Sequence, residues 1–201
     1  PERSNLYSAY SDKITGGYYD GIKEMVTDPT YTYHEIYPDN KIDGLTDGKD
    51  LTIDINRKKT YPTFTMRSIY GTLNGACDCD GLGVYDDLFS GIDEALSEDR
   101  QITVWNKFDN NYMPRIKPGK AKLLGIGTRW APKDVQGRRL ELLNNDPEYA
   151  EIRHREIVIP ALNENGKSNF DYPYKLGFTT KDYKRRMSSF ENNDDMASWL
   201  A

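Results

Sequence analysis

An apolar run that ends in two acidic residues constrains this chain more than any other feature. Residues 82–85 read Leu-Gly-Val-Tyr and are followed at once by Asp86 and Asp87. Unpaired charge is costly to bury, so packing alone does not account for carboxylates at the end of a buried strand. A second apolar run, residues 123–127, leads into Thr128 and Arg129. Neighbouring parallel strands bring their carboxyl ends to one crevice, so we expect these polar groups to lie together.

The residue types at these two strand ends match the needs of nucleotide hydrolysis. A nucleoside triphosphatase uses carboxylates to hold Mg²⁺ and orient water, and a polar residue to sense the γ-phosphate. The simpler alternative is that Asp86 and Asp87 cap the next helix in solvent, and that Thr128 caps a turn. For Arg129, the sequence leaves two roles open: contact with a phosphate, or pairing with a carboxylate. No G-x-x-x-x-G-K-[ST] phosphate loop occurs in the 201 residues.

Composition narrows the class of protein. The chain is long enough for one sizeable core with a small appendage. Its net charge of −5 is not the basic footprint of a dedicated nucleic-acid binder. No apolar run approaches the roughly 18 residues of a membrane span, and no signal peptide is visible. Cys77 and Cys79 are too close for an unstrained disulfide. We therefore expect free thiols, a cytoplasmic location and no membrane association.

Hydrophobic periodicity predicts the elements of the first half. Residues 5–9 form a strand, residues 14–26 a helix that ends at Asp28-Pro29, and residues 31–37 a short helix or ordered loop. Residues 51–55 and 63–66 alternate apolar and polar residues around a polar turn, which predicts a β-hairpin.

In the second half, helical spacing from Ile92 to Tyr112 predicts one long amphipathic helix, and Pro132 marks the start of another. Residues 156–159 predict a fifth strand. Residues 161–177 are polar and loop-like, and two closing helices follow, one with Tyr183, Met187 and Phe190, the other with Met196, Trp199 and Leu200. This alternation predicts an α/β fold with a mainly parallel sheet and helices on both faces.

The order of these segments resembles the ATPase domain of tailed-bacteriophage terminase large subunits, the motors that package viral DNA. Six segments are similar. They are a glycine-rich stretch (residues 71–75), an Asp-Asp form of the second Walker motif (83–88), the helix after it (94–105), a proline-glycine turn (113–119), the coupling segment (126–138) and a later strand (157–162). The run Gly127-Thr128-Arg129-Trp130 is the most specific of these.

The resemblance implies a P-loop NTPase fold of the ASCE/RecA-like type without its first Walker strand. Residues 1–160 would be a partial ATPase core, and residues 161–201 the start of a helical linker subdomain. The missing strand would leave residues 122–127 at an open sheet edge and residues 156–159 without their usual neighbour. The chain would be the middle portion of a longer polypeptide, with the phosphate loop upstream and a nuclease domain downstream.

The resemblance also implies roles for individual residues. Asp86 would hold Mg²⁺ through water, and Asp87 would replace the glutamate that activates the attacking water. Thr128 would couple the nucleotide state to DNA, with Arg129 beside it near the γ-phosphate. The implied cofactors are ATP and Mg²⁺. The implied partners are double-stranded DNA, the portal protein, the small terminase subunit and further copies of the chain in a ring. The implied location is the cytoplasm of the bacterial host during phage assembly, with the protein encoded by a phage or a prophage. Ala76 stands where many relatives carry a basic residue.

Two other functions remain open from the sequence. One is a metal-dependent nuclease in which Asp78, Asp80, Asp86 and Asp87 converge on hard cations. The other is a structural role for a degenerate nucleotide-binding fold.

Overall fold

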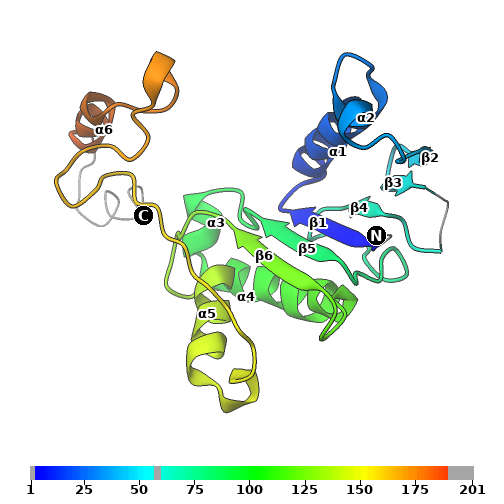
Figure 1. Cartoon of the computed structure of the whole chain (residues 1–201). Helices are drawn as coiled ribbons and strands as arrows, with labels where there is room; N and C mark the ends of the chain where they lie inside the picture. Colours follow the sequence, from blue (N-terminus) through cyan, green and yellow to red (C-terminus); the bar gives the residue numbers. More distant parts are fainter. Residues whose placement is uncertain (1–2, 57–59, 190–201) are drawn as a thin grey trace. The chain divides into compact units, whose positions relative to one another are not determined.

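The computed structural model describes residues 3–56 and 60–189, and the chain divides into two compact units, residues 1–127 and residues 128–201. The first unit contains a six-stranded sheet in the order β2-β3-β4-β1-β5-β6 (Figure 1). The strands are β1 (Asn5–Ala9), β2 (Ile42–Thr46), β3 (Leu51–Ile55), β4 (Phe64–Met66), β5 (Leu82–Asp86) and β6 (Lys122–Ile126).

The sheet is mainly parallel, as the sequence predicts. β1 pairs in parallel with β4 and β5, and β5 pairs in parallel with β6. The predicted hairpin is also present, because β3 and β4 pair antiparallel. β2 extends the sheet beyond β3; its residue pattern does not predict a strand, because Gly44 and Asp43 are poor strand formers.

Helix α1 (Asp12–Thr27) covers one face of this sheet (Figure 1). It begins where the Ser11 side chain accepts a hydrogen bond from the Ile14 N–H, and it ends at Asp28, the residue before a proline. Its buried Tyr19 packs with Ile53 and Met66. The short helix α2 (Tyr33–Ile36) follows within the stretch predicted to be a helix or ordered loop.

The helices that follow β5 differ from the prediction of one long helix. They are α3 (Ile92–Leu96), α4 (Glu98–Lys107), a π-helical turn (Phe108–Tyr112) and a 3₁₀ turn (Met113–Arg115). The break occurs at Ser97, whose backbone is extended and ends one helix as it starts the next. Tyr85 of β5 packs edge-on against Phe108, with ring centroids 4.8 Å apart, so this group packs against β5.

The second unit contains α5 (Val135–Asn145), 3₁₀ turns at Pro147–Tyr149 and Pro173–Lys175, and α6 (Thr180–Met187). Helix α5 begins at Val135 rather than Pro132 because Asp134 is its N-cap. Helix α6 contains Tyr183 and Met187 of the first predicted closing helix, whose Phe190 lies outside the described residues. The second, with Met196, Trp199 and Leu200, lies outside the described residues.

The predicted fifth strand is wrong. Residues 156–159 pair with no strand in the described part of the chain, and Ile157, Val158 and Ile159 are 70, 63 and 59% exposed. A β-branched run becomes a strand only when its backbone finds a partner, and β6 is the last strand of the sheet. The division into compact units falls after Gly127, and the domain boundary expected after residue 160 stays a prediction.

Two further predictions concern the thiols and the membrane. Cys77 and Cys79 are free and buried, and burial raises the pKa of the Cys77 thiol to about 12. This keeps the Cys77 thiol in the unreactive protonated form.

Within the described residues, no helix has both the length and the apolar character that crossing a bilayer requires.

Candidate functional site

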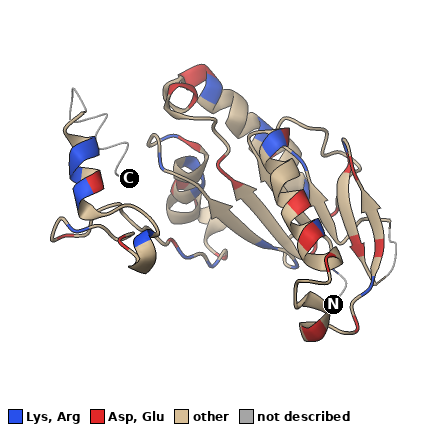
Figure 2. Ribbon diagram, turned by 90° about the horizontal axis from the view of Figure 1, so that it is seen from above, with Lys and Arg blue, Asp and Glu red and all other residues tan. Residues whose placement is uncertain are grey.

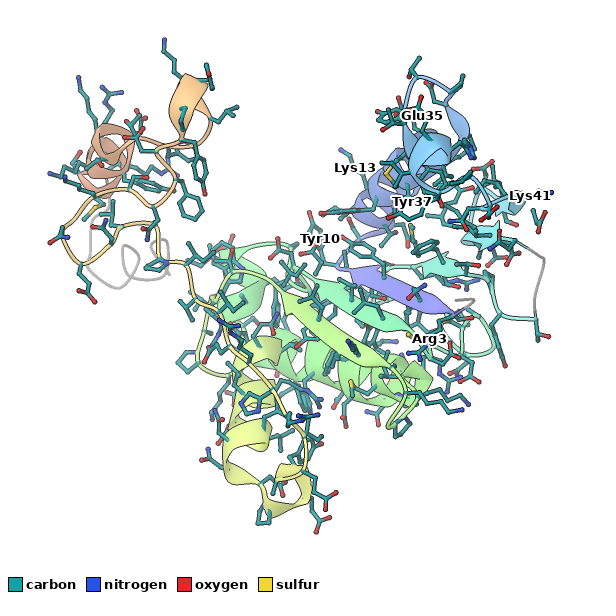
Figure 3. All side chains as sticks on the ribbon, viewed as in Figure 1. Arg3, Tyr10, Lys13, Glu35, Tyr37 and Lys41 are labelled. Carbon is teal, nitrogen blue, oxygen red and sulfur yellow. The ribbon has the colours of Figure 1, made fainter. Side chains whose placement is uncertain are left out.

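The carboxyl ends of β1, β5 and β6 meet at one edge of the sheet (Figure 1). Ala9, the last residue of β1, is in register with Asp86, and Asp86 is in register with Ile126. Figure 3 shows Tyr10 just beyond the end of β1. Thr128 follows Ile126 by two residues along the chain. The parallel register therefore brings the acidic pair next to the strand end that leads into Thr128.

The Asp86 carboxylate is held by a side chain from the neighbouring strand. The Tyr7 hydroxyl on β1 donates a hydrogen bond of 2.9 Å to Asp86 Oδ2, and the Tyr7 ring lies against the Tyr18 ring with centroids 4.6 Å apart. Burial, and then the bond to Asp86, raise the pKa of Tyr7 well above its ordinary value. The phenol is therefore a donor at every working pH. An ionised carboxylate has about four acceptor positions, so this bond leaves capacity for a further ligand.

Asp87 has an unusual backbone conformation. Its φ of 37° is in the left-handed region, which costs a non-glycine residue about 1 kcal/mol or more. Both neighbouring strands hold it there: the Asp87 N–H donates to the Ile126 carbonyl (3.1 Å), and the Asp87 carbonyl accepts from the Tyr10 N–H (3.3 Å). Strain that is maintained by surrounding structure is concentrated at functional sites.

The loop after Asp87 is also fixed. Glu94 Oε2 accepts hydrogen bonds from the Ser90 N–H and hydroxyl, both at 2.8 Å. The Tyr70 hydroxyl donates to Glu94 Oε1 at 3.1 Å. Burial acts to raise the pKa of Glu94, but the bonds from Ser90 and Tyr70 outweigh it and the pKa is lowered. Glu94 therefore stays ionised and ties the loop to the start of α3.

In the second unit, a buried carboxylate organises the segment that begins with Thr128. Asp134 is only 2% exposed. It accepts hydrogen bonds from the backbone N–H groups of Trp130, Ala131 and Gly137. Arg129 Nε lies 3.2 Å from Asp134 Oδ1. Of the two roles that the sequence leaves open for Arg129, the structure contains the pairing with a carboxylate.

The four aspartates of the nuclease alternative do not converge. Asp80 precedes β5 and Asp86 ends it, so about 20 Å of extended chain separates them. Asp80 accepts a hydrogen bond from the Ser4 N–H (2.9 Å), and Asp78 pairs with Lys117 (2.7 Å). No group of three or more potential metal ligands occurs among residues 3–56 and 60–189. The arrangement therefore does not support this alternative.

The acidic pair does fit a magnesium ion that is bound together with a nucleotide. Mg²⁺ keeps several waters and is usually held by one or two carboxylates plus substrate phosphates, so a cluster of three protein ligands is not required. Asp86 has the fixed orientation, spare acceptor positions and half-buried setting for this role. Asp87 is exposed at the same strand end, where a water molecule has access.

Sequence reasoning missed Tyr7 as part of this site. Its signal was weak, since Tyr7 lies in an apolar strand far from the acidic pair in sequence. Only the register of β1 against β5, which pairs Tyr7 with Val84, brings its hydroxyl to Asp86.

Comparisons with known proteins add no assignment. Neither the models of known protein families nor the curated proteins contain a match for this chain.

Proposed function

We propose that this chain is part of an ATP-hydrolysing motor of the terminase large-subunit class, which moves double-stranded DNA into viral procapsids. The observation that carries the proposal is the acidic pair at the end of β5, with Asp86 oriented by Tyr7 and Asp87 held in a strained backbone between β1 and β6. The resemblance of the segments around Asp86 and Thr128 supports the class of motor.

The chain's residues have distinct tasks in this proposal. The Mg²⁺ ion, when bound with ATP, neutralises charge that develops on the phosphates. Asp86 holds the ion's water shell. Asp87 accepts a hydrogen bond from the attacking water and orients it; it is one methylene shorter than glutamate, and its exposed position leaves room for that water. Thr128 follows the neighbouring strand and reports the state of the nucleotide to the second unit.

A phosphate-binding loop must come from outside these 201 residues, because their sequence contains none. The implied partners are portal protein, small terminase subunit and sister copies in a ring. The mainly parallel sheet with helices on both faces is compatible with a P-loop NTPase core. In such a core, the strand before the phosphate loop would pair with β6, on the side where the described residues provide no further strand.

The first test compares two proteins. The 201-residue chain alone is expected to show no measurable ATP turnover, because nothing in it cradles the β- and γ-phosphates. A protein that joins this chain to a phosphate-binding loop is expected to hydrolyse ATP only with Mg²⁺. Release of inorganic phosphate measures both. Robust turnover by the chain alone, or DNA cleavage with Mg²⁺ and no nucleotide, would show that the site is misassigned.

A second prediction concerns Tyr7. In the loop-joined protein, Tyr7→Phe is expected to raise the Mg²⁺ concentration for half-maximal hydrolysis by about tenfold, because outer partners of metal-holding groups contribute about 10–100-fold in affinity. The rate at saturating Mg²⁺ should change much less, since Asp86 itself is intact. Titration of hydrolysis rate against Mg²⁺ separates the two quantities.

The matched control is Tyr33→Phe. The Tyr33 hydroxyl accepts a hydrogen bond from Asn40 at 3.1 Å in the same unit and does not contact Asp86. It should leave the Mg²⁺ dependence unchanged. Equal effects from the two variants would mean that Tyr7 acts through general stability and does not position Asp86.

A further inference from the structure

Helix α6 concentrates positive charge in an acidic chain. Its eight residues contain Lys181, Lys184, Arg185 and Arg186 against one acidic residue, Asp182. Figure 2 shows this helix with mostly blue charged positions. The whole chain carries a net charge of −5, so this basic helix is a local feature rather than a consequence of overall composition.

Three of the cations share one face of α6. Lys181, Lys184 and Arg185 are spaced i, i+3 and i+4, which places their Cβ atoms about 5–6 Å apart on neighbouring turns, and all three are exposed. Tyr183 faces the other way and is buried at 7% exposure. Asp182 offsets only part of this charge, because it is one carboxylate beside several cations; it accepts hydrogen bonds from the Thr179 hydroxyl (2.6 Å) and N–H (3.1 Å) in the capping box.

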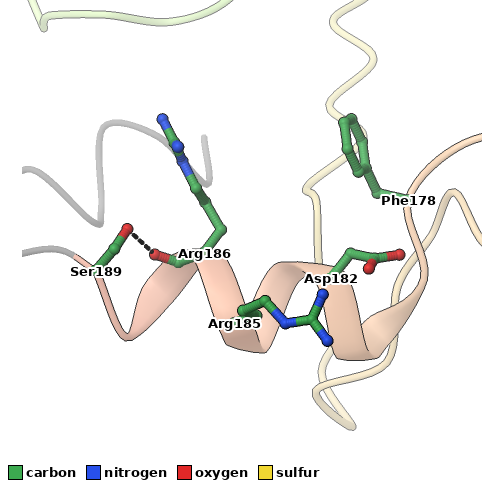
Figure 4. A pocket seen from close by; sticks show the side chains of 5 residues that line it. All are labelled: Phe178, Asp182, Arg185, Arg186 and Ser189. Atoms are coloured by element: carbon green, nitrogen blue, oxygen red, sulfur yellow. Dashed lines mark hydrogen bonds between the residues drawn. The ribbon is translucent and has the colours of Figure 1, made fainter.

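A hollow of about 550 Å³ adjoins this face (Figure 4). Its lining residues lie on α6 and just outside its two ends: Phe178, Asp182, Arg185, Arg186 and Ser189. The Phe178 ring is 61% exposed, although it also contacts the Tyr183 ring with centroids 5.6 Å apart. Arg185 belongs to both the cationic face and the hollow. An exposed aromatic ring held against a helix and bordered by guanidinium groups is a stacking platform.

We propose that this α6 surface, made of Phe178, Lys181, Lys184 and Arg185, binds single-stranded nucleic acid. The three cations contact successive phosphates, and one unpaired base enters the hollow and stacks on Phe178. A duplex offers the same phosphates, but its bases are already stacked and cannot cover the ring. The ring therefore favours a single strand over a duplex. The ligand of this surface thus differs from the double-stranded DNA that the proposed motor moves.

The experiment needs neither ATP nor Mg²⁺, so its outcome is separate from that of the proposed function. A fluorescein-labelled oligothymidine of about 20 nucleotides, long enough for the usual site sizes, is titrated with the 201-residue chain at several salt concentrations. Fluorescence anisotropy gives the dissociation constant. We expect binding that weakens with salt and exceeds that of a duplex of equal length.

Two variants separate the contributions. The triple variant Lys181→Ala/Lys184→Ala/Arg185→Ala is expected to reduce the slope of log affinity against log salt by about 2, as three phosphate contacts to a single strand predict. Phe178→Leu should weaken binding by about tenfold, the effect of losing one stacked base, with the salt slope unchanged. The matched control, Lys13→Ala/Lys49→Ala/Lys120→Ala, removes the same charge at exposed positions of the first unit and should retain most of the affinity.

Several outcomes would overturn the proposal. Equal affinity for the duplex, or no loss with Phe178→Leu, would reduce the surface to a non-specific anion patch. An equal loss of affinity in the control variant would show that the total charge of the chain, and not the α6 surface, determines binding. Stronger binding to vesicles of anionic lipid than to the oligonucleotide would assign the surface to a membrane. Circular dichroism of each variant checks that the helices remain. A Phe178→Tyr variant should bind the oligonucleotide as well as the unmodified chain does, because a tyrosine ring also stacks on a base.

Discussion

Asp86→Asn is expected to lower Mg²⁺-dependent ATP hydrolysis by about a hundredfold or more in the loop-joined protein, because a bound cation supplies several kcal/mol of charge stabilisation. The substitution preserves shape, and the amide oxygen still accepts the hydrogen bond that Tyr7 donates to Asp86. The negative charge that attracts the hydrated ion is what disappears. The measurement is the steady-state rate of phosphate release over a range of Mg²⁺ concentrations.

Asp80→Asn is the matched control for this prediction. Asp80 lies before the amino end of the same strand, where its carboxylate accepts the Ser4 N–H. This substitution removes the same charge near the opposite end of β5. Hydrolysis should stay within about twofold of the unmodified rate, as expected for a residue outside the reacting region. A near-normal rate in Asp86→Asn, or an equal loss in both variants, would exclude Asp86 as the residue that holds Mg²⁺.

Much of the sheet follows from local pattern. The apolar runs that became β1, β5 and β6 are bounded by polar residues, and their parallel pairing follows from the helices between them. The position of β6 at the sheet edge was expected from the resemblance. The convergence of Asp86 with the end of β6 is a direct result of parallel register, so it too was accessible from the sequence.

Three features that the sequence pattern does not reveal depend on a partner distant in the chain. Residues 156–159 have strand composition, but the described residues provide no strand for them to pair with. The bond between Tyr7 and Asp86 depends on cross-strand register, and the strained φ of Asp87 depends on Ile126 and Tyr10. Periodicity alone could not reveal the break at Ser97, because apolar spacing continues through it.

In the second unit, Asp134→Ala is expected to lower the free energy of unfolding by about 3 kcal/mol, a large effect for one residue. The carboxylate is buried and accepts hydrogen bonds from Gly137 N–H (2.7 Å), Trp130 N–H (3.0 Å) and Ala131 N–H (3.2 Å). Alanine leaves these donors unsatisfied and removes the N-cap of α5. Urea denaturation followed by tryptophan fluorescence measures the change.

Asp146→Ala is the matched control. Asp146 is also a capping carboxylate, but it accepts one exposed hydrogen bond, from the Glu148 N–H at 3.0 Å. Its loss should cost about 1 kcal/mol or less, near the lower range for caps. A loss in Asp134→Ala no greater than that in Asp146→Ala would mean that water satisfies the released N–H groups.

Asp134→Asn sharpens the same test. The amide has one acceptor oxygen in place of two, so it can keep the bond to Gly137 or those to Trp130 and Ala131, but not all three. We expect an intermediate loss of stability.

Because Thr128 and Arg129 lead directly into the turn around Asp134, Asp134→Ala and Asp134→Asn should also affect coupling. In the loop-joined protein, each variant should lose the response of the hydrolysis rate to added DNA. Hydrolysis without DNA should fall much less, since Asp86 and Asp87 belong to the first unit. An unaltered response to DNA in a variant whose Asp134 network is lost would separate the turn's structure from the coupling role proposed for Thr128.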